Sequence, residues 1–369
     1  MRILVHGFSS LRGGVETYLL SYCGMILRTH KDINFDFVVY GGVPDFVQPL
    51  IEAGCHFYKV TPRTSNLIEN YRQLASLIDK GSFDLLWFNA NTLSDITLFK
   101  IANDRGLKTI VHSHNSRLMG NRLNALLHYV HRPYVEKHVD MVTACSGDAA
   151  CFMYSDELCA SSRCRVLPNA IDCDVYRFSP VDRERIRAKL SLDGRFVVGN
   201  VGRFAVEKNH AFLLDVFKEI NSARPEAMLI LLGAGPEERN IRQKIEMLDL
   251  QQNVLMLGSV PDAFRYYSAM DCLVFPSIFE GMPLTLLEAQ ANGLRCVASD
   301  RIPSESFITN DCIKMPLDSS PAEWANVCLK GACDVSKRIS SADVLLKGGH
   351  DVSISSEELL RLFKDAFLL

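Results

Sequence analysis

The chain has 369 residues, of which 48% are hydrophobic and 22% charged, an ordinary globular composition at about twice the length of a typical domain. The formal charge of −3 and the pI near 6.4 exclude a strongly basic protein whose whole surface attracts nucleic acid. We therefore expect two domains, no nucleic-acid partner, and any anion site to be local.

The cysteines argue against disulfides and metal. Twelve of them are scattered singly, mostly within apolar segments, which is typical of small buried hydrophobes in a reducing compartment. Cys159 and Cys164 lack the spacing of a zinc site, so no metal is expected. Because the apolar run at the start is too short for a signal peptide and no run reaches about 18 residues, we expect a cytoplasmic chain that does not span a bilayer.

The first half alternates short apolar runs with amphipathic stretches, as in repeated βαβ units. The predicted strands are Ile3–Val5, Phe35–Val39, Leu85–Phe88 and Thr109–Val111, and the predicted helices are Glu16–Leu27, Leu67–Ile78 and Asp95–Ala102. The stretch Leu167–Asp172, followed by Ser179-Pro180 and the charged run Asp182–Arg187, interrupts this rhythm and predicts a hinge.

A second α/β series follows the predicted hinge. Its predicted strands are Phe196–Val201, Met228–Leu232, Val254–Leu257, Leu273–Phe275 and Cys296–Ala298, and its predicted helices are Ala211–Asn221, Glu237–Leu248, Ala263–Met270 and Leu284–Ala291. The amphipathic segment Glu357–Leu369 is expected to pack on either domain. The fold class is thus α/β, with a parallel sheet built twice.

A glycine loop, Gly7–Glu16, joins the first strand to a helix, where backbone N–H groups and the helix dipole favour an anion. The loop does not match G-x-G-x-x-G, and the second strand ends Val39-Tyr40-Gly41 without an acidic residue. A nicotinamide dehydrogenase therefore lacks its ribose anchor here. The alternative is that the glycines serve only a tight turn.

The loop Gly202–Asn209 opens the second domain with two cations, Arg203 and Lys208. It follows a predicted strand at the carboxyl end, where open α/β sheets bind ligands. A guanidinium fork together with a mobile ammonium suits a diphosphate better than a carboxylate. A solvated surface loop is the alternative.

The most specific motif is Phe275–Ala289. We expect Pro283 in the first turn of a helix that begins just after Gly281, with free N–H groups at its start. Glu280 precedes the helix and Glu288 lies inside it. A carboxylate beside bound phosphates is useful only if it binds hydroxyls, and a nucleotide sugar offers those of the sugar and of the ribose. Otherwise Glu288 is simply an exposed helix glutamate.

Two further segments of the first half carry candidate chemistry. His112 and His114 end a predicted strand and share one face, with a structural histidine as the alternative to a catalytic one. Between residues 117 and 138, Arg117, Arg122, Arg132 and Lys137 alternate with Leu118, Leu123, Leu126, Leu127 and Tyr129. This pattern fits a helix on an anionic membrane surface near a lipid-linked acceptor, or a plain amphipathic surface helix.

Together these motifs resemble the retaining glycosyltransferases of family 4, of the bacterial polysaccharide-biosynthesis type, which have the GT-B fold of two facing Rossmann-like domains with an interdomain cleft. The resemblance rests on Gly13–Glu16, Pro168–Asp172, Gly202-Arg203 with Lys208-Asn209, Leu232–Pro236, and the glutamates 280 and 288. It implies an N-terminal acceptor-side domain over 1–175, a donor domain over 185–350, and a C-terminal helix over 351–369 that packs back on the N-terminal domain. Val15 and Ala170 depart from the usual Ala and Gly without removing a reactive group.

The resemblance also implies a nucleotide-diphosphate sugar as donor, a glycan or lipid-linked acceptor, peripheral contact with the inner membrane face, and no metal or other cofactor. The implied catalytic residues are Glu280, His114, Arg203 and Lys208; the implied donor-binding residues are Gly13, Gly14, Arg203, Lys208, Gly258, Ser259, Glu280, Gly281, Met282, Pro283, Leu284, Thr285 and Glu288. Two rivals remain, a nucleotide-sugar epimerase of the same fold and a non-catalytic partner subunit. The presence of both cations and both glutamates disfavours the second.

Overall fold

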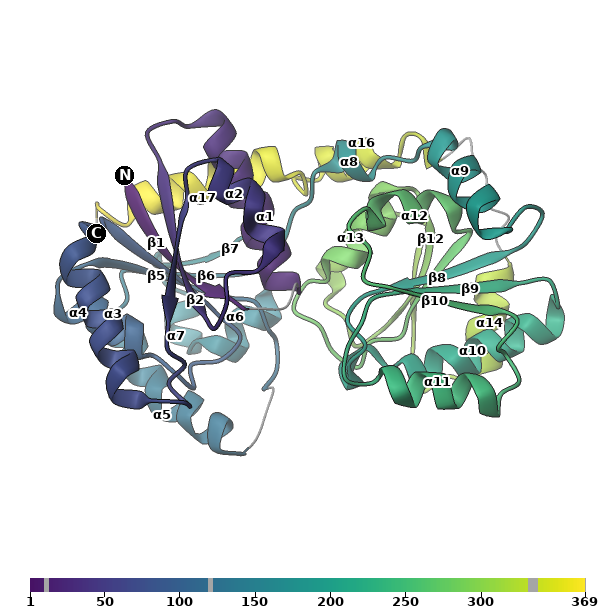
Figure 1. Cartoon of the computed structure of the whole chain (residues 1–369), viewed down its shortest axis with the longest axis horizontal. Helices are drawn as coiled ribbons and strands as arrows, with labels where there is room; N and C mark the ends of the chain where they lie inside the picture. The colour runs from purple at the N-terminus through teal and green to yellow at the C-terminus, as the bar shows by residue number, and fades with distance from the viewer. Residues whose placement is uncertain (10–12, 119–121, 331–337, 369) are drawn as a thin grey trace. The chain divides into compact units, whose positions relative to one another are not determined.

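The computed structural model describes residues 1–9, 13–118, 122–330 and 338–368. The chain divides into two compact units, residues 1–169 with 352–369 and residues 170–351. The boundary between the two units, at Asn169–Ala170, falls inside the predicted hinge segment. The expectation of an α/β chain with two Rossmann-like domains is confirmed, because each unit contains a fully parallel sheet with helices on both faces (Figure 1).

The first unit has a seven-stranded sheet in the order β3-β2-β1-β4-β5-β6-β7. Its strands are β1 (Arg2–Phe8), β2 (Asn34–Tyr40), β3 (His56–Val60), β4 (Leu85–Ala90), β5 (Lys108–Ser113), β6 (Met141–Ala144) and β7 (Cys164–Val166). Its helices are α1 (Gly14–Thr29), the 3-10 turn η1 (Asp45–Val47), α2 (Gln48–Glu52), α3 (Leu67–Gly81), α4 (Thr97–Asp104), α5 (Arg122–His138), α6 (Gly147–Met153), α7 (Asp156–Cys159) and α17 (Val352–Asp365).

The second unit has a six-stranded sheet in the order β10-β9-β8-β11-β12-β13. Its strands are β8 (Val197–Val201), β9 (Met228–Leu232), β10 (Val254–Gly258), β11 (Cys272–Phe275), β12 (Arg295–Ser299) and β13 (Cys312–Met315). Its helices are α8 (Cys173–Tyr176), α9 (Pro180–Leu190), η2 (Val206–Lys208), α10 (His210–Ala223), α11 (Glu238–Met247), α12 (Ala263–Ala269), α13 (Leu284–Ala291), η3 (Ser304–Ser306), α14 (Pro321–Leu329) and α16 (Ser341–Lys347).

Each sheet has a central pair of strands, β1 with β4 in the first sheet and β8 with β11 in the second. The remaining strands are added on both sides of this pair in chain order. Right-handed crossovers in opposite directions place helices on opposite faces, so α1 and α3 lie on different sides of the first sheet, as do α10 and α13 of the second (Figure 1). Connections leave such a central pair in opposite directions, and open α/β sheets bind ligands at the carboxyl ends of these strands. Each unit therefore has one predicted ligand position, set by its topology.

The charged run Asp182–Arg187, expected as part of the hinge, is helical. Ser179 caps α9 through its side chain, and Pro180 occupies the first turn, where a missing N–H costs nothing. Arg183 and Arg187 extend from α9 to Asp271, at 2.6 and 3.3 Å. These charges are therefore internal ion-pair partners rather than solvated linker residues.

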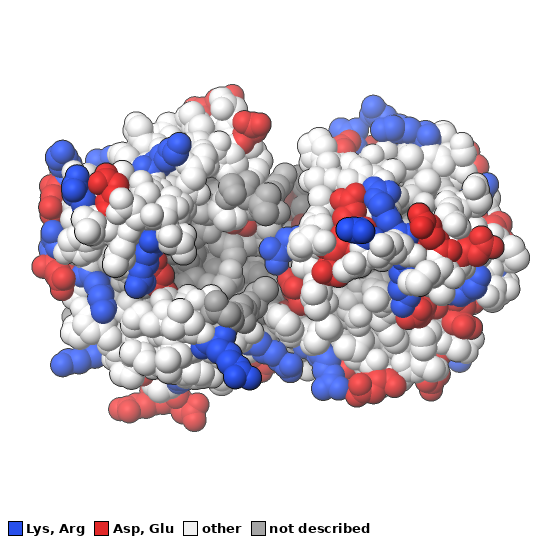
Figure 2. Space-filling view, turned by 60° about the horizontal axis from the view of Figure 1, so that its bottom comes forward, with Lys and Arg blue, Asp and Glu red and all other residues white. Residues whose placement is uncertain are grey.

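The C-terminal segment forms α17, which packs against α1 within the first unit. Phe363 of α17 lies 5.2 Å from the Trp87 ring and 6.4 Å from the Phe35 ring, so the end of the chain completes the core around the first sheet. Nine of the eleven cysteines in the described ranges are buried, and all eleven are free thiols. On the face drawn in Figure 2, lysines and arginines are interspersed with acidic side chains over both units.

Candidate functional site

The candidate site of the second unit is built from the loops after β8 and β11, the central strand pair. The ammonium Nζ of Lys208 lies 2.6 Å from Oε1 of Glu280, and both side chains are mostly buried. Lys208 also lies over the Phe275 ring at 5.1 Å. The backbone N–H of Ile278 donates to the carbonyl of Glu207 at 2.8 Å, which ties one loop to the other. The structure therefore joins two residues that are 72 positions apart in the chain.

Arg203 belongs to the same loop but has a different partner. Its Nη2 donates to Oε1 of Glu207 at 2.8 Å, and 46% of its side chain is exposed. Glu207 was not anticipated from the sequence, although its spacing of four residues from Arg203 is the spacing that pairs charges on one helical turn. Arg203 thus presents a solvent-accessible guanidinium on the same short loop as Lys208, paired with Glu207.

Three successive loops at this edge are locked by backbone hydrogen bonds that only glycine permits. The N–H of Gly202 donates to Leu232 and that of Gly233 donates to Gly258, at 2.9 and 2.8 Å. A Cβ on Gly233 would lie 1.9 Å from the carbonyl oxygen of Gly202, and the residue has φ +144°. The glycines of the 232–236 motif therefore hold the cationic loop close to its neighbours.

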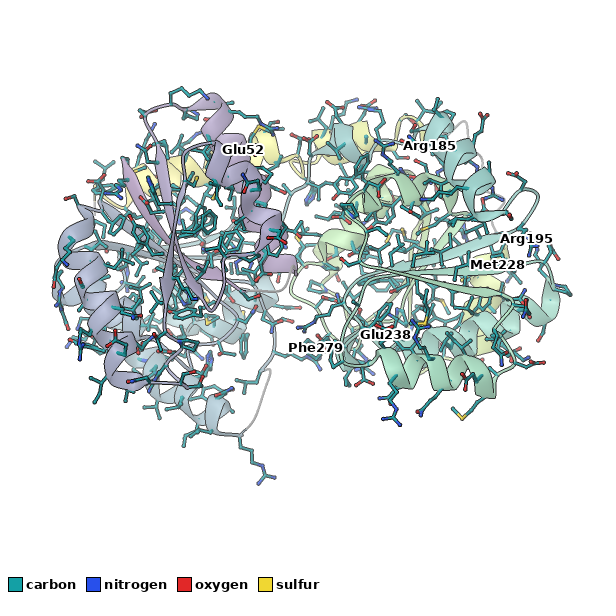
Figure 3. The ribbon with its side chains drawn as sticks, viewed as in Figure 1. Glu52, Arg185, Arg195, Met228, Glu238 and Phe279 are labelled. Carbon is teal, nitrogen blue, oxygen red and sulfur yellow. The ribbon has the colours of Figure 1, made fainter. Side chains whose placement is uncertain are left out.

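Helix α13 begins at Leu284 with Pro283 as its N-cap, which corrects the expected start just after Gly281. Met282 and Leu284 are buried. Gly281 lies just before the helix and Thr285 lies in its first turn. Phe279, labelled in Figure 3, lies in the loop that precedes the helix. The side chain of Pro283 has no acceptor for the N–H groups at the start of the helix, so no side-chain cap occupies them. The first turn therefore keeps N–H groups for an anion.

Glu288 is not an exposed helix glutamate, because only 8% of it is accessible. Its Oε2 accepts a hydrogen bond of 2.5 Å from the hydroxyl of Tyr267 on α12. Burial, with Glu288 beside it, raises the pKa of Tyr267 well above its usual value, so the tyrosine remains a donor. Tyr267 is a second residue that sequence reasoning missed.

Gly258 is the last residue of β10, the edge strand next to β9. Ser259 follows it and is exposed.

In the first unit, the glycine loop is already occupied by an internal anion. Oε1 and Oε2 of Glu16 accept from the backbone N–H groups of Ser9 and Gly13, each at 2.9 Å. The expectation of unpaired N–H groups is therefore wrong at these two positions, because the helix supplies its own carboxylate as a capping box. Gly14 stays exposed and has open space at its Cβ position. Residues 10–12 of the motif lie outside the described residues.

His114 follows β5 and is partly exposed, whereas His112 is fully buried. Their rings lie 4.4 Å apart, which bears out a shared environment. Burial lowers the pKa of His114 to about 3, and burial together with His114 lowers that of His112 well below its usual value. Nδ1 of His112 is hydrogen-bonded to the hydroxyl of Thr143 at 2.8 Å, which fits the structural alternative for this histidine. His114 is thus a neutral, accessible imidazole at neutral pH.

Two family models match consecutive parts of the chain. Residues 12–175 match the model described as Glycosyltransferase Family 4, and residues 182–312 match the model described as Glycosyl transferases group 1. A putative glycosyltransferase, EpsF of Bacillus subtilis, is 26% identical over 98% of this chain and 96% of its own length. The chain is a family 4-type glycosyltransferase with the GT-B fold.

This glycosyltransferase is also similar to another curated protein and to two solved structures. The UDP-Gal:alpha-D-GlcNAc-diphosphoundecaprenol alpha-1,3-galactosyltransferase of Escherichia coli is 24% identical, over 82% of this chain and 80% of that protein. Among solved structures, HepE of Anabaena in complex with UDP-glucose superposes with a TM-score of 0.82 and 19% identity, covering 99% of this chain and all of HepE. WaaG, involved in lipopolysaccharide biosynthesis, gives 0.73 and 15%, with 97% and 98% covered. These two structures support the fold.

His210 makes the stability of the glycosyltransferase pH-dependent. Only 3% of it is accessible, neither ring nitrogen has a hydrogen-bond partner within the described ranges, and burial lowers its pKa to about 4. Below pH 6.5 the unfolded chain binds a proton that the folded chain refuses, so stability falls as pH drops towards 4. We expect His210→Phe, which keeps the edge-on contact with Phe204, to remove this loss.

The measurement is denaturant unfolding of wild type and His210→Phe at pH 7.5 and pH 5. Since one pKa unit corresponds to about 1.4 kcal/mol, the variant should gain about 2 kcal/mol relative to wild type on going to pH 5. The chain has two tryptophans, so a Trp87→Phe background leaves Trp324 to report on the second unit. A difference that stays constant between the two pH values contradicts the prediction.

Proposed function

We propose that this glycosyltransferase moves a sugar from a nucleotide-diphosphate sugar to an acceptor hydroxyl with retention, in the synthesis of a capsular polysaccharide, exopolysaccharide or other cell-surface glycan. The observation that carries the proposal is the Lys208–Glu280 pair beside the first turn of α13. Cations and helix N–H groups suit a leaving diphosphate, while the carboxylates of Glu280 and Glu288 suit the hydroxyls of the sugar and the ribose.

In this proposal the bond between the anomeric carbon and the diphosphate oxygen breaks first. Arg203, Lys208 and the start of α13 meet the negative charge that grows on the leaving group, in place of a metal. The acceptor oxygen forms its bond to the same face of the anomeric carbon, and its proton passes to the departing phosphate oxygen. Glu280 and His114 would then hold the sugar, and Gly258 and Ser259 the base.

The test is transfer itself. The full-length protein is incubated with UDP- and GDP-sugars, with and without acceptors such as a diphospho-polyprenol glycan, and nucleoside diphosphate release is measured. Release that requires acceptor, with the product retaining the donor's anomeric configuration by NMR, supports the proposal. Conversion of the donor without acceptor would establish the epimerase alternative, which the glycosyltransferase relatives do not favour. A product with the opposite anomeric configuration would contradict the retaining mechanism.

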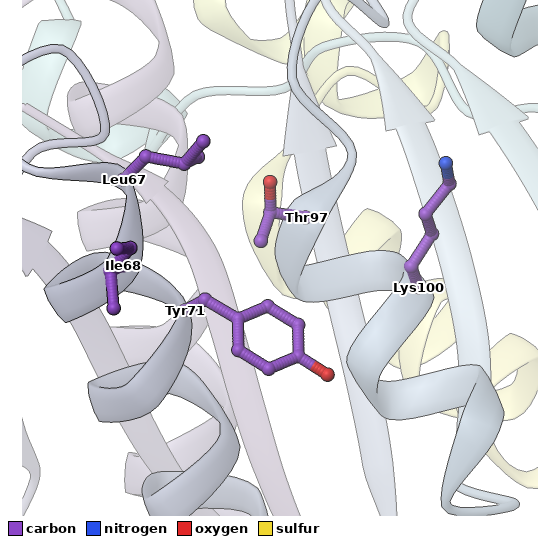
Figure 4. A pocket seen from close by; sticks show the side chains of 5 residues that line it. All are labelled: Leu67, Ile68, Tyr71, Thr97 and Lys100. Carbon is purple, nitrogen blue, oxygen red and sulfur yellow. The ribbon is translucent and has the colours of Figure 1, made fainter.

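We also propose a membrane-facing surface on the first unit. A cavity of about 430 Å³ lies between α3 and α4, and it is lined by Leu67, Ile68, Tyr71, Thr97 and Lys100 (Figure 4). Helix α4 contacts α5, since the Lys100 ammonium lies 5.0 Å from the centroid of the Tyr134 ring. Helix α5 exposes more than half of each of four apolar side chains, Leu123, Leu126, Tyr129 and Val130.

The α3–α5 surface, defined by Leu67, Ile68, Tyr71, Leu123, Leu126, Tyr129 and Val130, thus combines large exposed apolar side chains with the exposed cations Lys100 and Arg122. This combination is what an anionic lipid surface binds, and it would bring the enzyme to a lipid-linked acceptor. No helix in the described ranges is long and apolar enough to span a bilayer.

We expect the double substitution Leu126→Asp with Val130→Asp to weaken binding to phosphatidylglycerol vesicles at least about tenfold, since each side chain loses apolar burial and gains repulsion. Co-sedimentation with phosphatidylglycerol and with phosphatidylcholine vesicles measures this. Met247→Asp, at a still more exposed apolar residue of the second unit, is the control and should bind as wild type does. Equal sedimentation of all three proteins would contradict the proposal.

A further inference from the structure

The side chain that faces His114 is Asn89, at the end of the neighbouring strand β4. Strands β4 and β5 pair in register, with Asn89 opposite His112, so His114 emerges just beyond the end of β4. Oδ1 of Asn89 lies 2.9 Å from Nε2 of His114. Asn89 is only 2% accessible, whereas His114 reaches solvent. A buried amide therefore contacts the inner edge of an accessible imidazole.

The orientation of Asn89 is fixed by its other neighbours. Its Nδ2 donates to the carbonyl of Trp87 at 3.4 Å, which turns Oδ1 towards His114. The backbone carbonyl oxygen of Asn89 lies 3.1 Å from Nδ1 of His6. Gly7 passes so close that a Cβ there would lie 2.7 Å from Cβ of Asn89, and its φ of +131° also favours glycine. The glycine of the first strand thus makes room for this amide.

An amide oxygen only accepts hydrogen bonds, so Nε2 of His114 must carry the proton of the neutral ring. Nδ1 is then an unprotonated acceptor. The ring is held between His112 at 4.4 Å and Tyr18 at 5.0 Å, both neutral because burial lowers the pKa of the histidine and raises that of the tyrosine. The three side chains shown in contact with the imidazole, Tyr18, Asn89 and His112, are therefore uncharged.

We propose that Asn89 is a positioning residue: it holds His114 as the neutral Nε2–H tautomer, so that Nδ1 accepts a hydrogen bond from a hydroxyl of the bound sugar. The inference rests on the proposed function in so far as His114 contacts the donor. It assigns a role to the end of β4, which none of the sequence motifs covers, and it explains why a buried asparagine stands on an otherwise apolar central strand.

Two variants of Asn89 test the proposal by different routes. Asn89→Leu keeps the volume and removes the acceptor, so the tautomers become mixed and kcat should fall about tenfold, the value of one hydrogen bond. Asn89→Asp keeps the acceptor but adds a charge that favours the imidazolium. Protonated Nδ1 cannot accept, so this variant should approach wild-type kcat at pH 8 and lose activity as pH falls to 6, where wild type stays level.

Nitrogen-15 NMR of the histidine rings reads the tautomer without any substrate, with His114→Gln used to assign the signal. Thr109→Val, which removes a buried hydrogen bond at the opposite end of β5, controls for general destabilisation and should keep full turnover. If Asn89→Leu leaves the His114 signal unchanged while His114→Gln abolishes transfer, the proposal is overturned and the proposed function stands. If the tautomer changes but turnover of Asn89→Leu and His114→Gln is normal, the sugar contact of His114 is overturned, and the positioning role with it.

Discussion

Lys208→Met is expected to lower kcat for sugar transfer at least about a hundredfold, because an ammonium that meets the charge of a leaving diphosphate acts mainly in the transition state. The Lys208 ammonium is well placed for this role. It lies on a loop locked by backbone hydrogen bonds to β9, and it is mostly buried, where charge interactions are stronger than in water. Methionine retains the length of the stem and its packing near Phe275, so the fold should persist.

The matched control is Lys244→Met. Lys244 forms an ion pair of the same length, 2.6 Å, with Asp215 in the same unit, and its side chain is 23% exposed against 18% for Lys208. This pair joins α10 to α11 away from the site loops, and Asp215 is more exposed than Glu280. We expect the transfer rate of Lys244→Met to equal that of wild type. Steady-state kinetics with donor varied separates the two effects: Lys208→Met should lower kcat more than it raises KM for the donor. A full rate in Lys208→Met would remove this residue from the mechanism.

The apolar pattern of the sequence predicted the fold well because parallel strands are buried on both faces. Runs such as Leu85–Phe88 and Met228–Leu232 have few polar interruptions, and their strands lie at or beside the sheet centres. Not every strand was recognised: β3, β7 and β13 at sheet edges and the interior strand β6 were missed, whereas the edge strand β10 was predicted. The four missed strands have only three to five residues each, so their apolar runs are brief.

The candidate site was predictable where a motif lies on one loop, and not where a partner comes from elsewhere. Glu280 and Lys208 were both identified from local patterns, but their direct contact depends on β8 and β11 being neighbours. Glu16 is the opposite case. Its place at the third position of α1 was visible as a capping signature, yet the motif was interpreted as an anion site for a ligand.

Tyr267 and Asn89 carried no sequence signal. Asn89 is one polar residue in an apolar strand and Tyr267 stands among other polar residues of α12, and the role of each is set by what lies across from it. The same holds for the charged run after Pro180. The run was predicted as part of a hinge, whereas the fold provides a buried acceptor, Asp271, 84 residues beyond Arg187. Long-range polar pairs of this kind follow from topology rather than from periodicity.

Loss of Asp271 should strongly destabilise the second unit. Its carboxylate is 7% accessible and accepts from Nη2 of Arg183 at 2.6 Å, Nη1 of Arg187 at 3.3 Å and the N–H of Val197 at 2.8 Å. Asp271→Ala leaves two guanidinium groups and a strand N–H without this acceptor. Breaking one side of a buried ion pair costs about 3 to 5 kcal/mol, which corresponds to a fall of roughly 10 °C in Tm for a unit of this size.

The effect should be confined to the second unit, because α9, β8 and the turn before β11 all belong to it. Trp324 fluorescence in the Trp87→Phe background follows that unit alone. Asp318→Ala is the control: its ion pair with Arg301 is 2.8 Å long but 85% of the Asp318 side chain is exposed, and such pairs contribute about 0 to 1 kcal/mol. A Tm equal to that of Asp318→Ala would mean that Arg183 and Arg187 are solvated in the native protein. The charged run would then be a linker after all, and α9 would not be anchored to the sheet by its arginines.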